Sequence, residues 1–413
     1  MMERVVVTGL GIVSCAGSDV PTFWESLCEG KSGIGRISAF DPSILTSQIA
    51  GEVKDFTFDP KQAKRLGRFT QFALDASRQA LEQAGLMPEA ADSSAVNPQR
   101  IGVSIGSGIG GFTFLVEQHE KFLQKGPGRY HPLTVPIIIS NMAAANVSIH
   151  YKLHGPNVNI STACATGNHN IGYALDVIRL GRADAMLAGG VESTINPFAV
   201  DGYIQLRALS TRNDDPTGAS RPFSASRDGF VLAEGGGVLL LESLSHAQAR
   251  GAEILAEIAG YGMTSDGYHL TAPDPEGAGA ARAMQLALDD AGTNPEDVSY
   301  INAHGTSTLL NDKLETQAIK RVFGGHAKRL QVSSIKSMVG HGLGAAAGLE
   351  AVACVLALRD GVIPPTINLN DPDPELDLDF VPNEARKADI TTALSNAFAF
   401  GGQNASVMFR KFS

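Results

Sequence analysis

Apolar and polar positions alternate along the chain in two distinct ways. Short apolar runs rich in β-branched residues, bounded by glycine or small polar residues, are typical of strands. Longer segments that are apolar on one face or all round are typical of helices. Because the two kinds follow one another through the chain, we predict an α/β fold whose sheets are buried on both faces. Strands are expected at Val5–Val7, Arg100–Ser107, Asn157–Ser161, Ala185–Gly189, Val238–Leu241, Val298–Ala303, Gln331–Ser334 and Leu394–Asn396, and helices at Thr22–Cys28, Phe69–Ala84, Ala165–Leu180 and Gly342–Arg359.

Two distant segments share one layout. Thr162–Asp184 and Met338–Gly361 each begin with a turn of small residues, continue as an apolar helix and end in a Leu/Arg/Gly exit. This similarity predicts an ancient duplication, with two α/β halves at residues 1–252 and 253–413. The seam between them is expected at the glycine run 234–237, or just past the strand that follows it.

The glycines near the start of the chain allow two interpretations. Gly9 and Gly11 follow the first apolar run, as in a dinucleotide-binding turn. Ser14 stands where that motif has its third glycine. A tight strand-to-helix turn is therefore the better interpretation.

Composition narrows the classes of protein. The 413 residues carry a net charge of -10, which argues against a nucleic-acid partner. The densest apolar segment, Ala345–Leu358, contains Glu350 and falls short of the roughly 20 residues that span a bilayer, so we expect a buried helix and no membrane partner. The chain starts without a signal-peptide pattern, and its four cysteines show no metal-ligand spacing. A reduced, cytoplasmic protein is expected.

Cys164 is the strongest candidate nucleophile. It lies among small residues, between a predicted strand and a long apolar helix. The positive end of a helix dipole lowers a thiol pKa, and the backbone N–H groups there can hold an oxyanion. The alternative interpretation is a small buried apolar residue, which suits Cys354, Cys15 and Cys28 better.

His304 and His341 lie on glycine-rich loops of the second half. His304 follows a predicted strand, and glycine flanks His341 on both sides. A metal site would need a third protein ligand at a suitable spacing, and none is evident. We therefore expect acid–base and hydrogen-bonding roles for the two imidazoles and no metal.

Three further residues are candidates for supporting roles. An ion pair between Lys336 and Glu315 would brace the two histidine loops. The backbone N–H of Phe400, beside Gly401 and Gly402, could complete an oxyanion hole. The alternatives are solvated surface charges and a buried aromatic residue at a strand end.

Several motifs in one order carry a family resemblance. They are VVVTGLGIVS, GSGIGG, TACATG, RPFSASRDGFVLAEGGGVLLLE, NAHGTSTLLNDKLET, SSIKSMVGHGLGAAAG and SNAFAFGGQN. Together they resemble the β-ketoacyl-acyl carrier protein synthases of the type I/II branch, most closely the synthase II members, from Arg4 to Phe412. The resemblance implies a thiolase-like fold with a layered α-β-α-β-α arrangement and a homodimer. It also implies chain elongation without a cofactor, by decarboxylative condensation with malonyl-carrier protein.

The resemblance also implies roles for single residues. Cys164, His304 and His341 match the family's catalytic triad; Lys336 and Glu315 match its supporting pair, and Phe400 its gate. Thr271, Thr306 and Thr308 match threonines that contact pantetheine. The chain departs from the family at Ala399 and Gln403 beside the gate, and at Ala233 and Gly236.

The acyl carrier protein partner is acidic in such systems, so this acidic chain needs a local basic patch. We expect it at Lys64, Arg65 and Arg68, with Lys125, Arg129 and Arg207 as further candidates. A solvated helix face is the alternative. Other functions left open are a polyketide ketosynthase or synthase I, and a non-catalytic acyl-binding or chain-length subunit. A thiolase would need a second catalytic cysteine near the C-terminus, beyond Cys354.

Overall fold

One mixed sheet of ten strands runs through the described part of the chain, residues 2–87 and 97–412 of the computed structural model. Its strand order is β10-β9-β13-β14-β8-β1-β7-β6-β4-β5. This arrangement confirms the predicted α/β class. The strands are β1 (Val5–Val13), β4 (Ile101–Gly106), β5 (Asn157–Val158), β6 (Ala185–Glu192), β7 (Gly235–Ser243), β8 (Ala256–Ser265), β9 (Tyr300–Asn302), β10 (Gln331–Ser333), β13 (Thr392–Phe398) and β14 (Gln403–Arg410).

The sheet consists of two halves with the same topology. In the order β5-β4-β6-β7-β1, the first two pairings are parallel and the last two antiparallel. The order β10-β9-β13-β14-β8 repeats that pattern strand for strand. The halves meet where β1 pairs with β8 over Val5–Val7. This repeat is what a duplication would produce, while a division at residues 252 and 253 stays a prediction.

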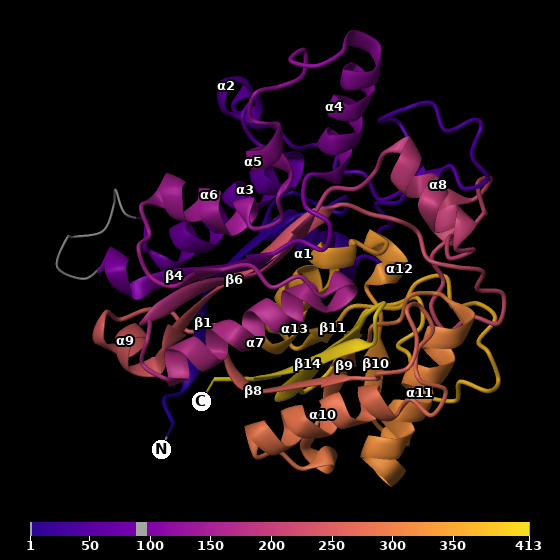
Figure 1. The fold of residues 1–413 in the computed structure, drawn as a ribbon. Helices are drawn as coiled ribbons and strands as arrows, with labels where there is room; N and C mark the ends of the chain where they lie inside the picture. Colours follow the sequence, from indigo (N-terminus) through magenta and orange to yellow (C-terminus); the bar gives the residue numbers. More distant parts are fainter. Residues whose placement is uncertain (1, 88–96, 413) are drawn as a thin grey trace.

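Helices form three layers around the two half-sheets (Figure 1). α3 (Arg68–Ala84) and α6 (Met142–Tyr151) cover the outer face of the first half. α10 (Ala278–Ala291) and α11 (Leu309–Phe323) cover the outer face of the second. Between the half-sheets lie α7 (Thr166–Arg179) and α13 (Ala346–Asp360), which contact strands of both. The all-round apolar sequence of α13 is explained by this central place.

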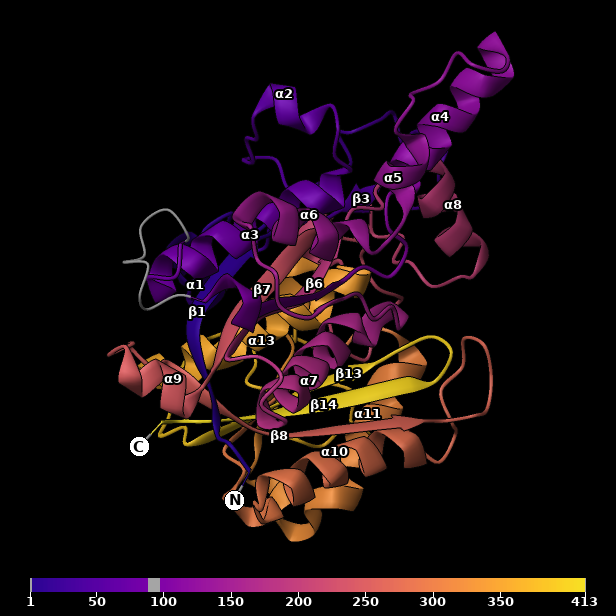
Figure 2. The ribbon, with the colours of Figure 1, turned by 60° about the vertical axis from the view of Figure 1, so that its left-hand side comes forward.

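The remaining elements lie around these layers. α4 projects away from the body in both ribbon views, and α5 lies at its base (Figure 2). No helix among the described residues has the length and apolar character needed to cross a membrane. The other elements are α1 (Val20–Cys28), β2 (Gly35–Arg36), β3 (Ile49–Ala50), α2 (Pro60–Ala63), α4 (Phe112–Lys125), α5 (Thr134–Ile138), α8 (Pro197–Gln205), α9 (Leu244–Ala249), α12 (Lys336–Val339), β11 (Val362–Ile363) and β12 (Arg386–Lys387).

Two glycine motifs do not lie where the sequence predicted. Gly9 and Gly11 are inside β1, so the predicted turn is wrong. A Cβ at Gly9 would lie 2.1 Å from the carbonyl oxygen of Ala80, and one at Gly11 1.7 Å from that of Ala76. Glycine is needed there because the backbone of α3 packs directly on the strand. The glycine run 235–237 likewise belongs to β7, within the first half-sheet, so of the two expected seam positions the one just past this strand stays a prediction.

Candidate active site

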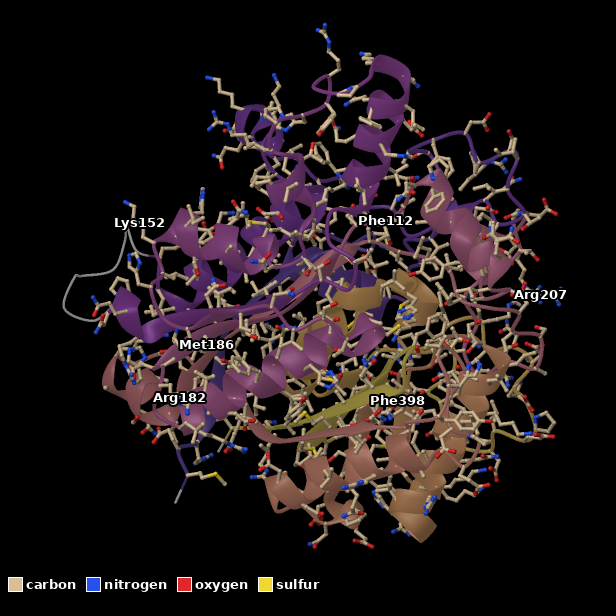
Figure 3. The ribbon with its side chains drawn as sticks, in the orientation of Figure 1. Phe112, Lys152, Arg182, Met186, Arg207 and Phe398 are labelled. Carbon is tan, nitrogen blue, oxygen red and sulfur yellow. The ribbon has the colours of Figure 1, made fainter. Side chains whose placement is uncertain are left out.

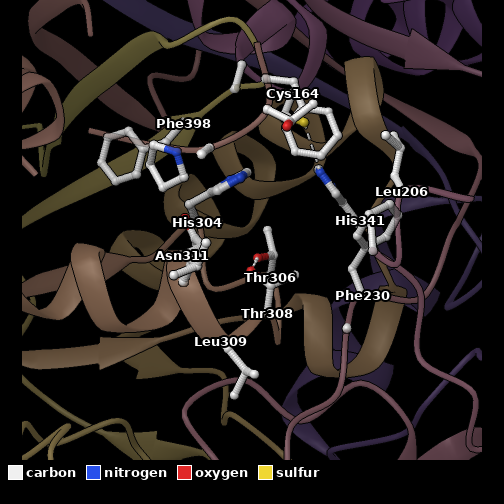
Figure 4. Close-up of a pocket in the computed structure, with 18 of the residues that line it drawn as sticks. Cys164, Leu206, Phe230, His304, Thr306, Thr308, Leu309, Asn311, His341 and Phe398 are labelled. Carbon is white, nitrogen blue, oxygen red and sulfur yellow. Dashed lines mark hydrogen bonds between the residues drawn. The ribbon is translucent and has the colours of Figure 1, made fainter. Parts of the chain in front are cut away.

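Cys164 lies on a strained turn at the start of a buried helix. The residues Ala163–Ala165 form a 3₁₀ turn, and α7 follows at once. Ala163 has a φ of 46°, a left-handed conformation that non-glycine residues seldom adopt. The turn leaves the thiol only 6% exposed and facing a cavity (Figure 4).

The structure brings the two histidines to the same place. The Nε2 atom of His341 lies 3.0 Å from the Sγ atom of Cys164. The imidazole of His304 stands nearly perpendicular to that of His341, with ring centroids 5.4 Å apart. Both rings also contact aromatic side chains, Phe398 beside His304 and Phe230 beside His341. Loops from both halves of the fold thus meet at one thiol.

The three side chains also form a set of potential metal ligands. One ligand atom from each of Cys164, His304 and His341 can be chosen so that all lie within 4.8 Å of one another. The sequence spacing showed no third ligand, but the fold supplies one, which is the thiol of the predicted nucleophile. A soft metal bound there would occupy the atoms that acyl transfer needs.

Burial controls the protonation of these groups. Burial lowers the pKa of both His304 and His341 well below the ordinary value, and the Lys336 charge acts in the same direction. Both imidazoles are therefore neutral near pH 7. Burial also raises the pKa of the Cys164 thiol to about 11, although Lys336 and backbone N–H groups oppose it. The predicted lowering of this pKa is wrong in the resting site because desolvation outweighs the helix dipole.

Lys336 pairs with a different carboxylate from the predicted one. Its Nζ atom forms an ion pair with Glu350 of α13, and both side chains are almost wholly buried. Glu315 instead accepts hydrogen bonds from the backbone N–H groups of His304 and Gly305, both at 2.8 Å. The expected Lys336–Glu315 pair is therefore wrong, although both residues do support the His304 loop.

Glu350 was not recognised from the sequence as a site residue. The available signal was a single carboxylate in an otherwise apolar helical segment. A buried carboxylate requires a cation or hydrogen-bond donors, so it pointed to a partner such as Lys336. Burial raises the pKa of Glu350 to about 7, and Lys336 opposes that rise.

The contact with Lys336 fixes the tautomer of His304. The Nζ atom lies 3.4 Å from Nδ1 of His304, and an ammonium can only donate. Nδ1 therefore accepts, and the ring hydrogen is on Nε2, which is free for a substrate. His341 is not held in this way, since its buried Nδ1 has no hydrogen-bond partner in the described structure.

The β13–β14 turn closes the other side of the thiol. The backbone N–H groups of Phe400 and Cys164 both interact with the sulfur and favour its ionised form. Two N–H groups that converge beside one thiol are what an oxyanion hole requires. Gly401 and Gly402 follow with φ values of 87° and 74°, and the backbone N–H of Ala399 donates to the carbonyl of Gln403 at 2.9 Å. Phe400 itself is 36% exposed at the cavity.

A cavity of 340 Å³ leads to the triad. Its wall is mostly apolar, and all three predicted pantetheine threonines line it. The hydroxyls of Thr306 and Thr308 lie 2.9 Å apart. Further lining residues, which the sequence did not single out, are Leu206, Phe230, Leu309, Leu310 and Asn311.

The predicted docking residues differ in their surroundings. Lys64 and Arg65 are exposed at the end of α2. Arg68 opens α3, forms a 2.8 Å ion pair with Glu234 and lies over the ring of Phe72. Its positive charge is therefore neutralised by Glu234 within the fold. Lys125 and Arg129 are exposed, and Arg207 lies on the outer surface just past α8, where it lines the cavity (Figure 3).

Comparison with known proteins places this geometry in a family. The "Beta-ketoacyl synthase, N-terminal domain" model matches residues 2–247, and the "Beta-ketoacyl synthase, C-terminal domain" model matches residues 255–370. The chain is 50% identical over 413 residues to a 3-oxoacyl-[acyl-carrier-protein] synthase 2 of Coxiella burnetii, covering 99% of each chain. It is 51% identical over 414 residues to the protein of that name from Staphylococcus aureus strain N315, again covering 99% of each.

Solved structures show the same fold at full length. A beta-ketoacyl synthase from Burkholderia phymatum has a TM-score of 0.91 at 38% identity, and the ishigamide ketosynthase/chain length factor has 0.92 at 36%. The TM-score is 0.90, at 38% identity, for a structure described as a type II PKS acyl-carrier protein in complex with its ketosynthase bound to the hexaketide. Each match covers 100% of both chains. The predicted thiolase-like fold and family are confirmed: the chain belongs to the beta-ketoacyl synthase family.

Proposed function

We propose that this protein elongates acyl chains in fatty acid biosynthesis by decarboxylative Claisen condensation. The observation that carries the proposal is one buried thiol 3.0 Å from one neutral imidazole, with a second imidazole in the same cavity. The full-length identity of 50% to 3-oxoacyl-[acyl-carrier-protein] synthase 2 supports fatty acids over polyketides as products. The ketosynthase solved with a type II PKS acyl-carrier protein is 38% identical.

The first half-reaction loads the enzyme. Sγ of Cys164 attacks the carbonyl carbon of an acyl thioester on the carrier protein, while Nε2 of His341 takes the thiol proton. The backbone N–H groups of Cys164 and Phe400 hold the oxyanion. The carbon–sulfur bond to the carrier then breaks, and the carrier thiol leaves with the proton. A neutral His341 suits this step because it can accept a proton.

The second half-reaction extends the chain. The carbonyl of malonyl-carrier thioester accepts a hydrogen bond from Nε2 of His304, whose tautomer Lys336 fixes. His341 has its ring hydrogen on Nδ1 after loading, but no partner holds that nitrogen in the described structure, so the hydrogen can move to Nε2 in the acyl-enzyme and give a second hydrogen bond. Loss of CO2 leaves an enolate that these donors stabilise. Its carbon attacks the acyl carbonyl, and the Cys164 thiolate departs, leaving a 3-oxoacyl-carrier product.

Charged groups behind the triad support these steps. Lys336 keeps the hydrogen of His304 on Nε2, and Glu350 offsets the ammonium charge in the buried site. Glu315 holds the backbone of the His304 loop. These are positioning roles, because none of the three carboxylate or ammonium groups lines the cavity.

We also propose that the carrier protein docks beside α2 and the cavity mouth. Lys64 and Arg65 supply exposed positive charge at α2 and Arg207 supplies it at the cavity, and Arg68 is left out because Glu234 neutralises it. Thr271, Thr306 and Thr308 line the route that the pantetheine arm would follow. A structurally similar ketosynthase has been solved with its acyl-carrier protein.

A homodimer is the proposed working form. β5 is the outermost strand of the first half-sheet and has an edge to offer a second copy. The neighbouring arm of α4 and α5 carries exposed apolar side chains, which are Leu115, Phe122, Leu123, Tyr130, Leu133, Val135 and Ile139. Burial of such a set favours association.

All four cysteines are free thiols, which suits the reducing cytoplasm.

An elongation assay tests the proposed function. Purified enzyme is given a series of acyl-carrier thioesters with malonyl-carrier protein, and the product is identified by mass. We expect a 3-oxoacyl product two carbons longer and release of CO2. An acyl-binding subunit would form no adduct on Cys164, and a polyketide ketosynthase would extend unreduced 3-oxo chains repeatedly.

A further inference from the structure

Glu192 is a buried carboxylate outside the triad that touches loops of both halves. It ends β6 and is 0% exposed. Its Oε1 atom accepts a 2.8 Å hydrogen bond from the hydroxyl of Ser107. Its Oε2 atom accepts hydrogen bonds from the backbone N–H groups of Gly108 at 2.8 Å and Gly344 at 3.2 Å. The carboxylate therefore joins the loop after β4 to the turn that opens α13.

The first of these loops leads to the nucleophile. The carbonyl of Gly108 accepts a 3.1 Å hydrogen bond from the hydroxyl of Ser161, three residues before Cys164. A Cβ at Gly108 would lie 3.6 Å from the Cα atom of Ala163. Ala163 is the left-handed residue directly before the nucleophile. Glu192 therefore holds the backbone on which the strained thiol turn rests.

The second loop leads to the imidazole. Gly344 lies three residues after His341, in the 3₁₀ turn Leu343–Ala345. A Cβ at Gly344 would lie 2.5 Å from the backbone nitrogen of Gly108 and 2.7 Å from Oε2 of Glu192. The two loops are thus in direct backbone contact around one carboxylate oxygen.

We propose that Glu192 is a positioning residue that holds the Cys164 turn and the His341 loop at the separation that acyl transfer needs. The separation in question is the 3.0 Å between Sγ and Nε2. The proposal rests on the proposed function for the reaction itself, but the contact is a property of the thiol and the imidazole alone.

The chemistry of the partners explains why this position uses a carboxylate. Both glycine N–H groups can only donate, and Ser107 donates because its oxygen already accepts from the N–H of Gly110 at 2.8 Å. One oxygen that accepts from both glycine N–H groups is therefore required, and the other side-chain atom is paired with Ser107. Burial raises the pKa of Glu192 to about 7, while these donors oppose the rise. Burying a carboxylate is unfavourable, so an apolar residue would be the more stable choice if the loops had no need of a link.

Three variants at this position test the proposal. Glu192→Gln keeps one oxygen for the two glycines and an amide that can donate to Ser107, so kcat should stay within about threefold. Glu192→Met fills the space without an acceptor, and kcat should fall at least about 30-fold with KM within about twofold. Glu192→Asp is one methylene shorter, so its carboxylate oxygens lie farther from the two loops and kcat should fall about tenfold.

A second readout does not depend on the condensation reaction. The rate at which iodoacetamide alkylates Cys164 reports how well His341 assists the thiol. We expect alkylation to slow at least about fivefold in Glu192→Met and to stay near wild type in Glu192→Gln. If wild-type enzyme condenses no substrate, the proposed function fails, while the alkylation rates still decide the role of Glu192.

Glu242 provides the matched control. It is also a fully buried carboxylate on a neighbouring strand, where it binds Thr8, His246 and Arg250. Glu242→Met should lower thermal stability and leave kcat and alkylation within about twofold of wild type. The proposal is overturned if folded Glu192→Met keeps wild-type kcat and alkylation, or if Glu192→Gln is as impaired as Glu192→Met. If Glu192→Met does not fold, wild-type kcat in Glu192→Asp overturns it.

Discussion

Two turns at equivalent places in the halves perform different tasks. In the first half, the 3₁₀ turn Ala163–Ala165 opens α7, and in the second, Leu343–Ala345 opens α13. Each turn begins with a left-handed residue, at a φ of 46° for Ala163 and 50° for Leu343. The middle residue is the proposed nucleophile Cys164 in one turn and Gly344 in the other. The same backbone thus presents a thiol in one half and an N–H group to Glu192 in the other.

The helices that follow the two turns differ as well. α7 is also largely buried, but it buries polar side chains at Asn168, His169 and Asn170. α13 is buried from Ala346 to Leu358, and the one carboxylate in that stretch, Glu350, pairs with Lys336. The first half therefore supplies the nucleophile, and the second supplies the two imidazoles and the charge behind them. The two halves thus share the backbone geometry of the turn, and they differ in chemistry at its middle residue.

Removing the thiol from the first turn should have the largest effect. Cys164→Ala should lower condensation at least about 1,000-fold, because no other group can carry the acyl chain. Steady-state assay of 3-oxoacyl product measures this loss. Cys354→Ala, a buried thiol of α13, is the control and should retain activity. Substantial elongation by Cys164→Ala would remove the distinction between the two turns.

Removing the Lys336 charge behind the second turn should have the second-largest effect. Lys336→Met leaves Glu350 buried without its partner and frees the tautomer of His304. Loss of one member of a buried pair typically costs about 3 to 5 kcal/mol of unfolding free energy. Urea unfolding measures this, and kcat should fall with it. The control is Lys328→Met. Lys328 forms an exposed ion pair with Asp377, so its loss should change the free energy of unfolding by less than about 0.5 kcal/mol.

Crowding the second turn should have an intermediate effect. Gly344→Ala puts a methyl group against the Gly108 backbone and should cost about 1 to 3 kcal/mol through overpacking. It should also lower kcat, because His341 is carried on the same loop. Gly325→Ala is a suitable control, since an added Cβ there meets nothing within 4 Å. Equal kcat values for the two variants would show that the second turn tolerates a side chain as the first does.

Changing charge outside both turns should have the smallest effect. Arg65→Glu should raise KM for carrier-bound substrates by a few fold, equivalent to about 1 kcal/mol, with kcat nearly unchanged. The difference should shrink as salt is added. Alkylation of Cys164 by iodoacetamide should not change. A KM equal to that of wild type would remove Arg65 from the docking surface.

Local sequence patterns predicted much of this molecule. The apolar periodicity and the positions of the glycines predicted the principal strands and helices and the layout shared by the two turns. They also singled out Cys164, His304 and His341, because small or glycine neighbours stand beside each of them. The family resemblance supplied the reaction, which the residues alone left open.

The errors came from contacts between distant residues. Gly9 looked like a turn because nothing local reveals that α3 lies on its strand. Lys336 was paired with Glu315 because the carboxylate of Glu350 approaches it from α13 only in the folded chain. The Cys164 pKa was expected to be low because a helix start is visible in sequence, whereas the depth of burial is not.

The most direct test of the account follows the acyl group on one sulfur. Wild-type enzyme is mixed with acyl-carrier protein alone, and the peptide containing Cys164 is weighed by mass spectrometry; malonyl-carrier protein is then added. We predict an acyl adduct on Cys164 that disappears as 3-oxoacyl-carrier product and CO2 form in equal amounts. Absence of the adduct, or its loss to free fatty acid without an elongated product, would contradict it.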